Sequence, residues 1–417
     1  MTNQALQDKL HLSLEPTMTK NKNNFHLYTN LCSKRVHRVL FDCYKITGVN
    51  AAQNFFSLIA SGLNKNTEKA VFVNSILPIN SKEHKRVFWV FPSEKENDIE
   101  YNYIPLINLP FIRNVLLSTY IFFEIIFKRN ISQSTDIVVL DYLRFSVNLG
   151  ATLACRIRRI KTLVIATDLP GEDVFEKTFQ SKIRNSFIFL LNYDFFVCLT
   201  EELNSVVNTK KRPSVIIESF ANENFTKKTN LIQDKYDERV IVYAGGIYER
   251  YGIKNLIDGF KRIEDENVKL WFYGVGSFVE AIQEYSKLDG RIVYKGVVQN
   301  EDLIEILSRA TLLINPRPSN EIFTKYTFPS KNMEFMATGT PLVTTRLPGI
   351  PEDHWPYIYF IDDETELGIF NTLNTLLQKS KGELHSFGAQ CKEFTLANKN
   401  NIIQAKKMIT LINQNNE

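Results

Sequence analysis

Short apolar runs rich in β-branched residues alternate with longer amphipathic runs along most of the chain. Apolar runs of about four to eight residues are typical of buried strands, whereas apolar positions three and four apart are typical of helices. This alternation predicts an α/β fold, with mostly parallel sheets that helices cover on both faces. In the first half of the chain the predicted strands are 36–41, 70–74, 137–140, 162–166, 195–199 and 214–217, and the predicted helices are 50–63, 113–128, 149–158, 181–191 and 201–208.

A second series of the same kind follows a polar segment, residues 220–238. That segment has no apolar period, so it is predicted to be a linker between two domains. At 417 residues the chain is also too long for one ordinary hydrophobic core. The predicted strands of the second series are 240–244, 269–273, 291–295, 312–315, 342–345 and 357–361, and its predicted helices are 254–263, 279–288, 302–310, 330–337, 365–379 and one or two within 391–412.

The expected organisation is therefore two Rossmann-like domains. Residues 1–24 are polar without a strong period and are expected to form a loose N-terminal extension. The first domain covers residues 25–219 and the second covers residues 239–385. Glu218 closes a strand just before the linker, where it either lines a cleft or caps a hinge.

Charge and cysteine content exclude several classes of protein. The formal net charge of +4 is close to neutral for this length, and no stripe of Lys and Arg with interleaved aromatic residues argues for nucleic-acid binding. The five cysteines are scattered without a CxxC pair, which indicates a reducing compartment and argues against disulfides or a zinc site. No N-terminal stretch has the layout of a signal peptide, so a cytoplasmic location is expected.

Two apolar stretches raise the question of membrane contact. Val115–Phe127 is too short to span a bilayer and contains Glu124, and Phe187–Leu191 follows two basic residues. We interpret both as buried core helices, which are common in α/β domains. Peripheral contact with the inner face of the cell membrane is the alternative.

Three successive strands of the second series end in glycine. The carboxyl ends of parallel strands meet at one edge of a sheet, and glycine there lets the backbone approach an anionic group. A tight turn explains any one of these glycines equally well, but the three ends together predict the floor of a nucleotide-binding crevice. The positions concerned are Gly245 and Gly246 after the first strand, Gly274 and Gly276 after the second, and Gly296 with Val297 after the third.

The segment 316–345 carries the most information about chemistry. It reads as a polar loop, a short helix, a Gly-Thr-Pro corner and a strand, with Ser330, Lys331 and Glu334 within about one helical turn. Glu334 either accepts hydrogen bonds from the hydroxyls of a ribose or only complements the helix dipole. Lys331 and Arg317 would ordinarily be solvent-exposed, but their convergence with a glycine-rich edge favours contact with phosphate.

Candidates in the first half rest on single positions. Asp168 follows a strand within Thr-Asp-Leu-Pro, where it could contact substrate hydroxyls or transfer a proton, or simply start a turn. Gly48 and Val49 follow another apolar run in the same way. No GxSxG, HExxH, Walker A or Cys/His pair is present, so neither a hydrolytic triad nor a metal or other cofactor is expected.

Taken together, these segments resemble the retaining nucleotide-sugar glycosyltransferases of family 4, which have the GT-B fold. The segments that carry the resemblance are VIVYAGGIYERYGIKNLIDGF, LWFYGVGS, RIVYKGVV, IYFIDDE and the long block TKYTFPSKNMEFMATGTPLV. That block is similar to the T-x-Y-S-F-P-S-K signature of bacterial capsule and exopolysaccharide transferases. The resemblance implies two facing Rossmann-like domains with a deep interdomain cleft, and residues 386–417 resemble the last helices, which return to the first domain.

The sequence departs from the family pattern at the diphosphate clamp. Glu334 matches the family's ribose-binding carboxylate, but Tyr326 stands where a donor-sugar carboxylate is expected. Gly246 and Tyr251 replace an Arg and a Lys that hold the donor diphosphate. We infer that Lys331 replaces these cations, together with Arg317 or Arg250. Thr324 and Ser330 complete the donor-binding set, and Asp168, with Gly48 and Val49, belongs to the acceptor side, where Asp168 matches a frequent histidine.

The resemblance implies metal-independent transfer of a hexose from a nucleotide diphospho-sugar, a co-substrate, to a glycan or lipid-linked glycan, in surface polysaccharide synthesis. One alternative is a nucleotide-sugar epimerase on the same fold. Another is a non-catalytic GT-B subunit that binds a partner transferase, since the usual cations are missing at Gly246 and Tyr251.

Overall fold

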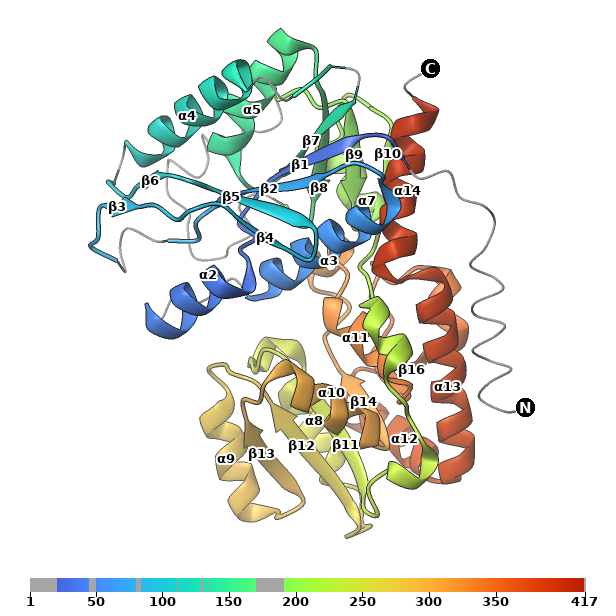
Figure 1. The fold of residues 1–417 in the computed structure, drawn as a ribbon. Coiled ribbons are helices and arrows are strands. Elements are labelled where there is room, and N and C mark those ends of the chain that lie inside the picture. The colour runs from blue at the N-terminus through green and yellow to red at the C-terminus, as the bar shows by residue number, and fades with distance from the viewer. Residues whose placement is uncertain are drawn as a thin grey trace. The chain divides into compact units, whose positions relative to one another are not determined.

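The computed structural model describes residues 21–44, 50–79, 84–110, 112–128, 131–133, 135–169 and 191–415. The chain divides into two compact units (Figure 1). Unit 1 consists of the chain up to Ile217 together with the segment from Asn401 onward, and unit 2 consists of Glu218–Asn400. Within the described ranges, every helix is too short or too polar to cross a lipid bilayer.

Unit 1 is built on an eight-stranded sheet in the described part of the chain. Neighbouring strands run parallel, except for the edge pair β4–β5, which is antiparallel. The order is β10 (Ser214–Ile216), β9 (Phe195–Cys198), β8 (Lys161–Ala166), β7 (Asp136–Asp141), β1 (Asn24–Thr29), β2 (Val71–Ile76), β5 (Ile99–Ile104) and β4 (Glu94–Glu96). A separate antiparallel pair joins β3 (Phe88–Trp89) to β6 (Leu106–Ile107).

The helices of unit 1 include one from the far end of the chain. They are α2 (Lys34–Arg38), the π-helix η1 (Val39–Cys43), α3 (Asn50–Asn66), α4 (Arg113–Phe127), α5 (Phe145–Arg158), α7 (Glu201–Val207) and α14 (Asn401–Gln414). Helix α14 packs on α3 so closely that a Cβ atom on Gly62 would lie 2.2 Å from the carbonyl oxygen of Asn401. Glycine at this position therefore permits the contact that attaches the C-terminal helix to unit 1.

Unit 2 is a six-stranded, fully parallel sheet with helices on both faces. Along β11 (Arg239–Ala244), Ile241 and Tyr243 face one apolar cluster and Val240 and Val242 face the other, as the two-residue period of a strand requires. The sheet order is β13 (Ile292–Gly296), β12 (Val268–Tyr273), β11, β14 (Leu312–Asn315), β15 (Leu342–Thr345) and β16 (Tyr359–Ile361).

The helices of unit 2 divide between these two clusters. Helices α8 (Ile253–Phe260), α9 (Val279–Leu288) and α12 (Glu366–Leu377) contribute to the first, and α10 (Asn300–Arg309) and α11 (Ser330–Thr338) contribute to the second. Helix α13 (Lys381–Asn398) contributes mainly to the second, but its Leu384 lies in the first. Short 3-10 helices lie in the connections, namely η2 (Glu223–Lys227), η3 (Ile232–Asp234), η4 (Glu249–Tyr251), η5 (Ile322–Lys325) and η6 (Glu352–Tyr357). The predicted α/β class with parallel sheets is confirmed for both units.

Two local predictions are wrong. Residues 36–41 were predicted to be a strand, but they lie in α2 and η1, because Ser33 caps that helix by accepting a hydrogen bond from the Val36 N–H. Residues 115–127 were interpreted as a buried core helix, but the outer side of α4 is exposed. Most of the predicted helix 181–191 lies outside the described residues.

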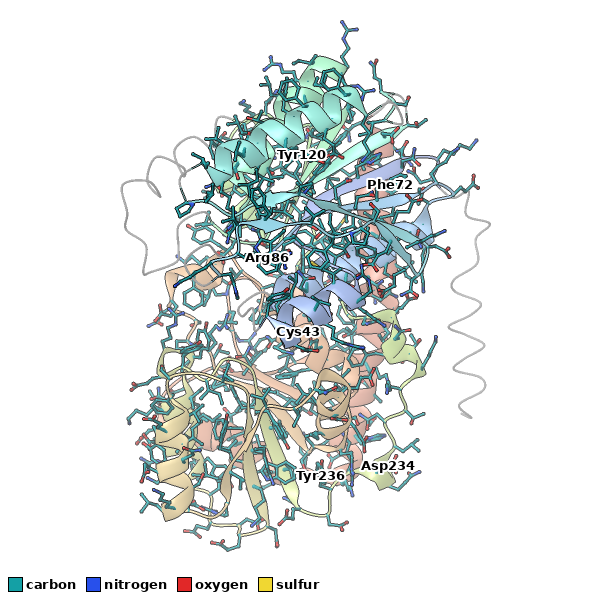
Figure 2. The ribbon with its side chains drawn as sticks, turned by 60° about the vertical axis from the view of Figure 1, so that its left-hand side comes forward. Cys43, Phe72, Arg86, Tyr120, Asp234 and Tyr236 are labelled. Carbon is teal, nitrogen blue, oxygen red and sulfur yellow. The ribbon has the colours of Figure 1, made fainter. Side chains whose placement is uncertain are left out.

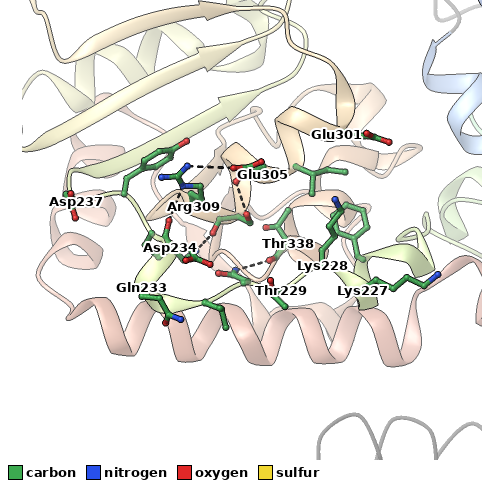
Figure 3. Close-up of a pocket in the computed structure, with 17 residues that line it drawn as sticks. Lys227, Lys228, Thr229, Gln233, Asp234, Asp237, Glu301, Glu305, Arg309 and Thr338 are labelled. Atoms are coloured by element: carbon green, nitrogen blue, oxygen red, sulfur yellow. Dashed lines mark hydrogen bonds and ion pairs between the residues drawn. The ribbon is translucent and has the colours of Figure 1, made fainter. Parts of the chain in front are cut away.

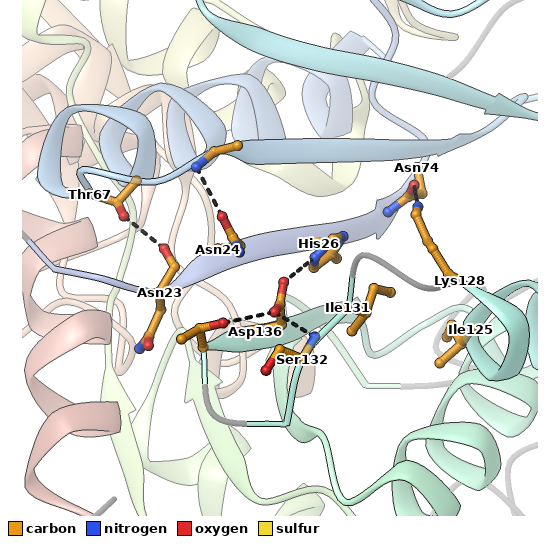
Figure 4. Close-up of polar contacts among 12 residues, drawn as sticks. Asn23, Asn24, His26, Thr67, Asn74, Ile125, Lys128, Ile131, Ser132 and Asp136 are labelled. Carbon is orange, nitrogen blue, oxygen red and sulfur yellow. Dashed lines mark hydrogen bonds and ion pairs between the residues drawn. The ribbon is translucent and has the colours of Figure 1, made fainter.

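Buried polar pairs tie strands and segments together. His26 and Asp136 lie on neighbouring strands, fully buried, with the imidazole Nε2 2.6 Å from the carboxylate (Figure 4). In unit 2, the Lys399 ammonium lies 3.0 Å from Glu218 and 2.8 Å from Asp353. The Lys399 carbonyl accepts a hydrogen bond from the Ala221 N–H, so the first and last residues of unit 2 are joined.

The cysteines differ sharply in accessibility. Cys43 is exposed in η1 (Figure 2), whereas the other four, Cys32, Cys155, Cys198 and Cys391, are buried free thiols. Burial raises the pKa of Cys32 to about 11 and those of Cys155 and Cys198 to about 12. Because the thiolate is the reactive form, we expect a chromogenic disulfide reagent at mildly alkaline pH to modify one thiol per folded chain and all five after denaturation. Rapid modification of more than one thiol in the folded protein would contradict this.

Candidate functional site

The carboxyl edge of the unit 2 sheet carries most of the predicted donor residues. Strands β11, β12 and β13 lead into Gly245, Gly274 and Val297 respectively. The Gly245 N–H donates to the Tyr273 carbonyl and the Gly274 N–H donates to the Gly296 carbonyl, both at 3.0 Å. The three strand ends therefore form one continuous rim, as the sequence predicts.

The glycines on this rim differ in how much space surrounds them. A Cβ atom on Gly274, whose φ is +134°, would lie 1.9 Å from the Gly245 carbonyl oxygen, and one on Gly276 would lie 1.9 Å from that of Ile247. Packing alone accounts for these two. A Cβ atom on Gly245 would meet only Tyr243, at an ordinary 3.7 Å. Its open side is therefore available to a ligand.

The loop after β11 is held against the loop after β14. The Tyr243 hydroxyl donates to the Gly246 carbonyl at 2.6 Å. Gly252 has a φ of +78°, and a Cβ atom there would lie 2.1 Å from the Pro316 carbonyl oxygen. This close approach places the ring of Tyr251 beside the guanidinium of Arg317, with 4.4 Å between the Cζ atom and the ring centroid.

Arg317 is a half-buried cation without a carboxylate partner among the described residues. Its Nε is buried and unbonded in that part of the chain, and its guanidinium lies between the rings of Tyr251 and Phe323. Burial lowers the pKa of Arg317, and the neighbouring Arg250 lowers it further, yet an arginine remains charged at neutral pH. A cation in this state gains from an incoming anion.

Arg250 is the second cation at this position. It is exposed in η4, with its guanidinium 5.3 Å from the ring centroid of Tyr251. Tyr251 therefore contacts two arginines, Arg250 beside it in η4 and Arg317 on the loop after β14. The sequence predicted Arg317 or Arg250 at this site but not that both contact Tyr251, because cation–π pairs between distant loops leave no periodic trace.

Lys331 and Glu334 lie in the first turn of α11, as predicted, and are paired with each other. The Lys331 ammonium is 2.6 Å from the Glu334 carboxylate. Ser330 is exposed at the first position of the helix, and Pro329 before it provides no side-chain cap. The first N–H groups of the helix therefore lack a side-chain acceptor at the N-cap, which suits an anionic ligand.

A carboxylate that the sequence analysis missed shapes the loop after β14. The Ser319 N–H donates to both carboxylate oxygens of Glu364, at 3.1 Å each. Thr324 is buried, and its hydroxyl donates to the carbonyls of Glu321 and Ser319, so it holds the loop from within. Tyr326 follows η5 and is half-buried. The sequence could have pointed to Glu364, because it lies in an Ile-Asp-Asp-Glu run that directly follows a predicted strand.

The predicted acceptor residues belong to unit 1. Asp168 is half-buried two residues after β8, and its carboxylate accepts a hydrogen bond from the Leu169 N–H at 2.8 Å. That geometry is a local turn contact. Gly48 and Val49 lie outside the described residues.

A pocket of about 720 Å³ lies elsewhere in unit 2 (Figure 3). It lies between the segment 225–237 and α10, where Arg309 donates to the Asp234 carbonyl. None of the predicted donor residues lines it. In the described ranges, no group of three His, Cys, Asp or Glu side chains is placed to hold a metal ion.

Residues 238–379 match the family described as Glycosyl transferases group 1. This match covers nearly all of the sheet just described, and unit 2 therefore contains a glycosyltransferase group 1 domain. No curated protein sequence matches the chain significantly.

Solved structures are similar over nearly the whole chain. A sucrose-phosphate synthase from Thermosynechococcus elongatus has a TM-score of 0.64 at 14% identity, over 94% of this chain and 98% of its own. Anabaena HepE in complex with UDP has a TM-score of 0.64 at 10% identity, and the match covers 94% of this chain and 100% of HepE. The lipopolysaccharide outer core galactosyltransferase WaaB has a TM-score of 0.59 at 15% identity, and the match covers 94% of this chain and 99% of WaaB. The chain therefore has the GT-B fold.

Proposed function

We propose that the chain is a retaining glycosyltransferase that moves a sugar from a nucleotide diphospho-sugar to a glycan or lipid-linked glycan acceptor in surface polysaccharide synthesis. One observation carries the proposal: Arg317 is a half-buried guanidinium without a carboxylate partner in the described chain, on the glycine-lined rim of a glycosyltransferase group 1 domain. We also propose that the chain belongs to the subgroup of bacterial capsule and exopolysaccharide transferases that has the T-x-Y-S-F-P-S-K signature.

The chemistry of a departing diphosphate explains why this cation matters. Negative charge grows on the leaving group as the glycosidic bond breaks, and preorganised donors stabilise it most effectively where water is scarce. Arg317 offers a planar fork of N–H groups that fits phosphate oxygens. Gly245 leaves room for the phosphate, and the uncapped start of α11 adds amide donors. These groups perform the task without any step that needs a metal.

The ion pair between Lys331 and Glu334 has a specific place in this scheme. When a nucleotide binds, Glu334 accepts hydrogen bonds from the ribose hydroxyls, and the Lys331 ammonium remains beside it to face the phosphates. Glu334→Gln keeps the size of the side chain but weakens both contacts. We expect calorimetry to show about ten-fold weaker nucleotide binding, because hydrogen bonds to a charged group contribute about 1.5–3 kcal/mol. Unchanged affinity would contradict a role in ribose binding.

The structural relatives suggest which donor to test first. HepE structures contain UDP, UDP with glucose, and UDP-glucose. We therefore propose a UDP-sugar as the first candidate. We place the reaction in the cytoplasm, because the five cysteines are free thiols, as is usual in a reducing compartment.

A screen of UDP-, GDP- and ADP-sugars for thermal stabilisation tests the donor site, since a ligand that binds the folded state raises the melting temperature. Product analysis of the stabilising donor then tests the reaction. Slow release of free sugar with the anomeric configuration retained, or transfer to an acceptor, supports the proposal. Conversion to an epimeric nucleotide-sugar would assign the chain to the epimerases. Stabilisation by no nucleotide-sugar would favour the non-catalytic subunit.

A further inference from the structure

Helix α4 carries an apolar face that the described part of unit 1 leaves exposed. Leu117, Ile121 and Ile125 are buried on the inner side of α4, as an amphipathic helix requires. The opposite side is apolar as well, and the exposed side chains there are Ile112, Val115, Leu116, Tyr120, Phe123 and Phe127. Val115 is 65% exposed and Phe127 is 72% exposed, so these are not marginal core positions. Figure 2 labels Tyr120 on this helix.

Helix α5 continues the same face. Leu149, Leu153 and Ile157 are four residues apart, which places them in one stripe, and all three are exposed. The two helices touch: a Cβ atom on Gly150 would lie 2.1 Å from the Ser118 carbonyl oxygen (Figure 1). The exposed residues of α4 together with these three leucine and isoleucine residues form what we call the α4–α5 face.

The ends of the two helices are joined as well. The Arg158 guanidinium donates to the carbonyls of Ile125, Lys128 and Ile131, which fixes the last turn of α5 against the last turn of α4. The pair therefore forms one platform, and its exposed apolar residues hold fixed positions relative to one another. Contiguous apolar surface of this kind marks interaction sites in soluble proteins.

Basic side chains predominate around the α4–α5 face. Arg156 and Arg159 are exposed at and just after the end of α5, and Lys161 at the start of β8 is exposed as well but lies 3.9 Å from the partly exposed Asp194 carboxylate. The acidic residues of the segment 113–161 point inward: Glu124 accepts a hydrogen bond from the buried Tyr28 hydroxyl and pairs with Lys128, and Asp136 and Asp141 are buried. The result is an apolar platform with a basic border.

We propose that the α4–α5 face docks unit 1 onto an anionic lipid surface. The apolar residues enter the boundary between headgroups and acyl chains, and the arginines meet lipid phosphates, which is the usual geometry of interfacial helices. A second copy of this chain would offer the apolar half of the contact but would bring the same basic border, so that its arginines would face arginines. An anionic membrane complements both halves. This proposal is independent of the activity of unit 2.

Sedimentation of the full chain with lipid vesicles tests the proposal. We expect binding to vesicles that contain phosphatidylglycerol, little binding to phosphatidylcholine alone, and weaker binding at high salt. Phe123→Ser with Phe127→Ser should weaken the partition coefficient more than about ten-fold. Arg156→Gln with Arg159→Gln should weaken it about 25-fold, since each basic residue near such a surface changes binding about five-fold.

Matched controls separate the face from general surface properties. Leu288→Ser removes an exposed apolar side chain of unit 2, and Lys210→Gln with Lys211→Gln removes two exposed charges, one of them in the left-handed conformation that Arg159 also adopts. Both controls should bind vesicles as the wild type does, and all variants should keep its melting temperature.

Three results would overturn the proposal. The first is a wild-type chain that does not sediment with phosphatidylglycerol vesicles. The second is a wild-type dimer that Phe123→Ser with Phe127→Ser converts to a monomer without any effect on vesicle binding, which would assign the face to a second copy. The third is a large fall in the melting temperature of that variant, which would show that the face is covered by the chain itself.

Discussion

Arg317→Gln is expected to lower the turnover of the donor about 10²–10³-fold while the protein remains folded. Glutamine retains an amide donor but loses the charge and the two-pronged geometry of the guanidinium. The growing charge of the leaving diphosphate would then lack its main counter-charge. The measurement is the initial rate of nucleotide diphosphate release with the donor found by the stabilisation screen, together with a melting curve for each variant.

Two companion variants test the reason for that loss. Arg317→Lys keeps the charge, and its turnover should lie between that of the wild type and that of Arg317→Gln. Arg346→Gln is a matched control, because Arg346 also follows a strand of this sheet and lies over aromatic rings but already has a carboxylate partner, Asp362, at 2.6 Å. Its turnover should be that of the wild type. Wild-type turnover in Arg317→Gln would remove this residue from the mechanism.

Lys331→Ala examines the second cation of the site. Because Lys331 is paired with Glu334 before any ligand binds, its removal takes a positive charge away from that carboxylate. We expect turnover to fall severely and nucleotide affinity to fall with it, since the negative charge of Glu334 then repels the phosphates more strongly. Lys331→Ala combined with Glu334→Gln should regain part of the affinity, which would locate the loss in the repulsion.

Lys399→Met is expected to lower the free energy of unfolding of unit 2 by about 3–5 kcal/mol. Lys399 and Glu218 are 4% and 8% exposed, so the variant leaves a buried carboxylate without its cation. The variant also removes a contact of Asp353. In the wild type, the hydrogen bond from His354 and the ammonium of Lys399 hold the pKa of Asp353 well below its usual range. Urea unfolding monitored by circular dichroism measures the change.

A double variant and a surface control make this test specific. Lys399→Met with Glu218→Gln removes the charge on both sides and should recover much of the lost stability. Lys287→Met breaks the pair with Glu284, in which both side chains are about two-thirds exposed, and should change stability by less than about 1 kcal/mol. A loss of under about 1 kcal/mol in Lys399→Met would show that the pair contributes little. Glu218, for which the sequence left two roles open, would then have no part in joining the ends of unit 2.

The sequence predicted the sheets and the rim because both depend on short-range pattern. Apolar runs of strand length between amphipathic segments determine parallel α/β units. Glycines that follow consecutive strands fall at one edge for the same reason, and the start of α11 was predicted to the residue from Ser330. The failure at 36–41 is also local in origin, since a capping serine outweighed the preference of valine and leucine for strands.

The sequence by itself thus determined the fold class, the glycine-lined rim and the grouping of Ser330, Lys331 and Glu334 within about one helical turn, because periodicity and spacing fix which edge or face a residue occupies. Only the tertiary structure decided that Arg317 lies beside Tyr251, that Glu364 holds the loop below it, and that α4 exposes its aromatic side. These contacts join loops and helices far apart in the chain. Whether such a side chain ends up paired, stacked or exposed depends on which distant neighbour packs against it, and that neighbour leaves no mark on the local pattern.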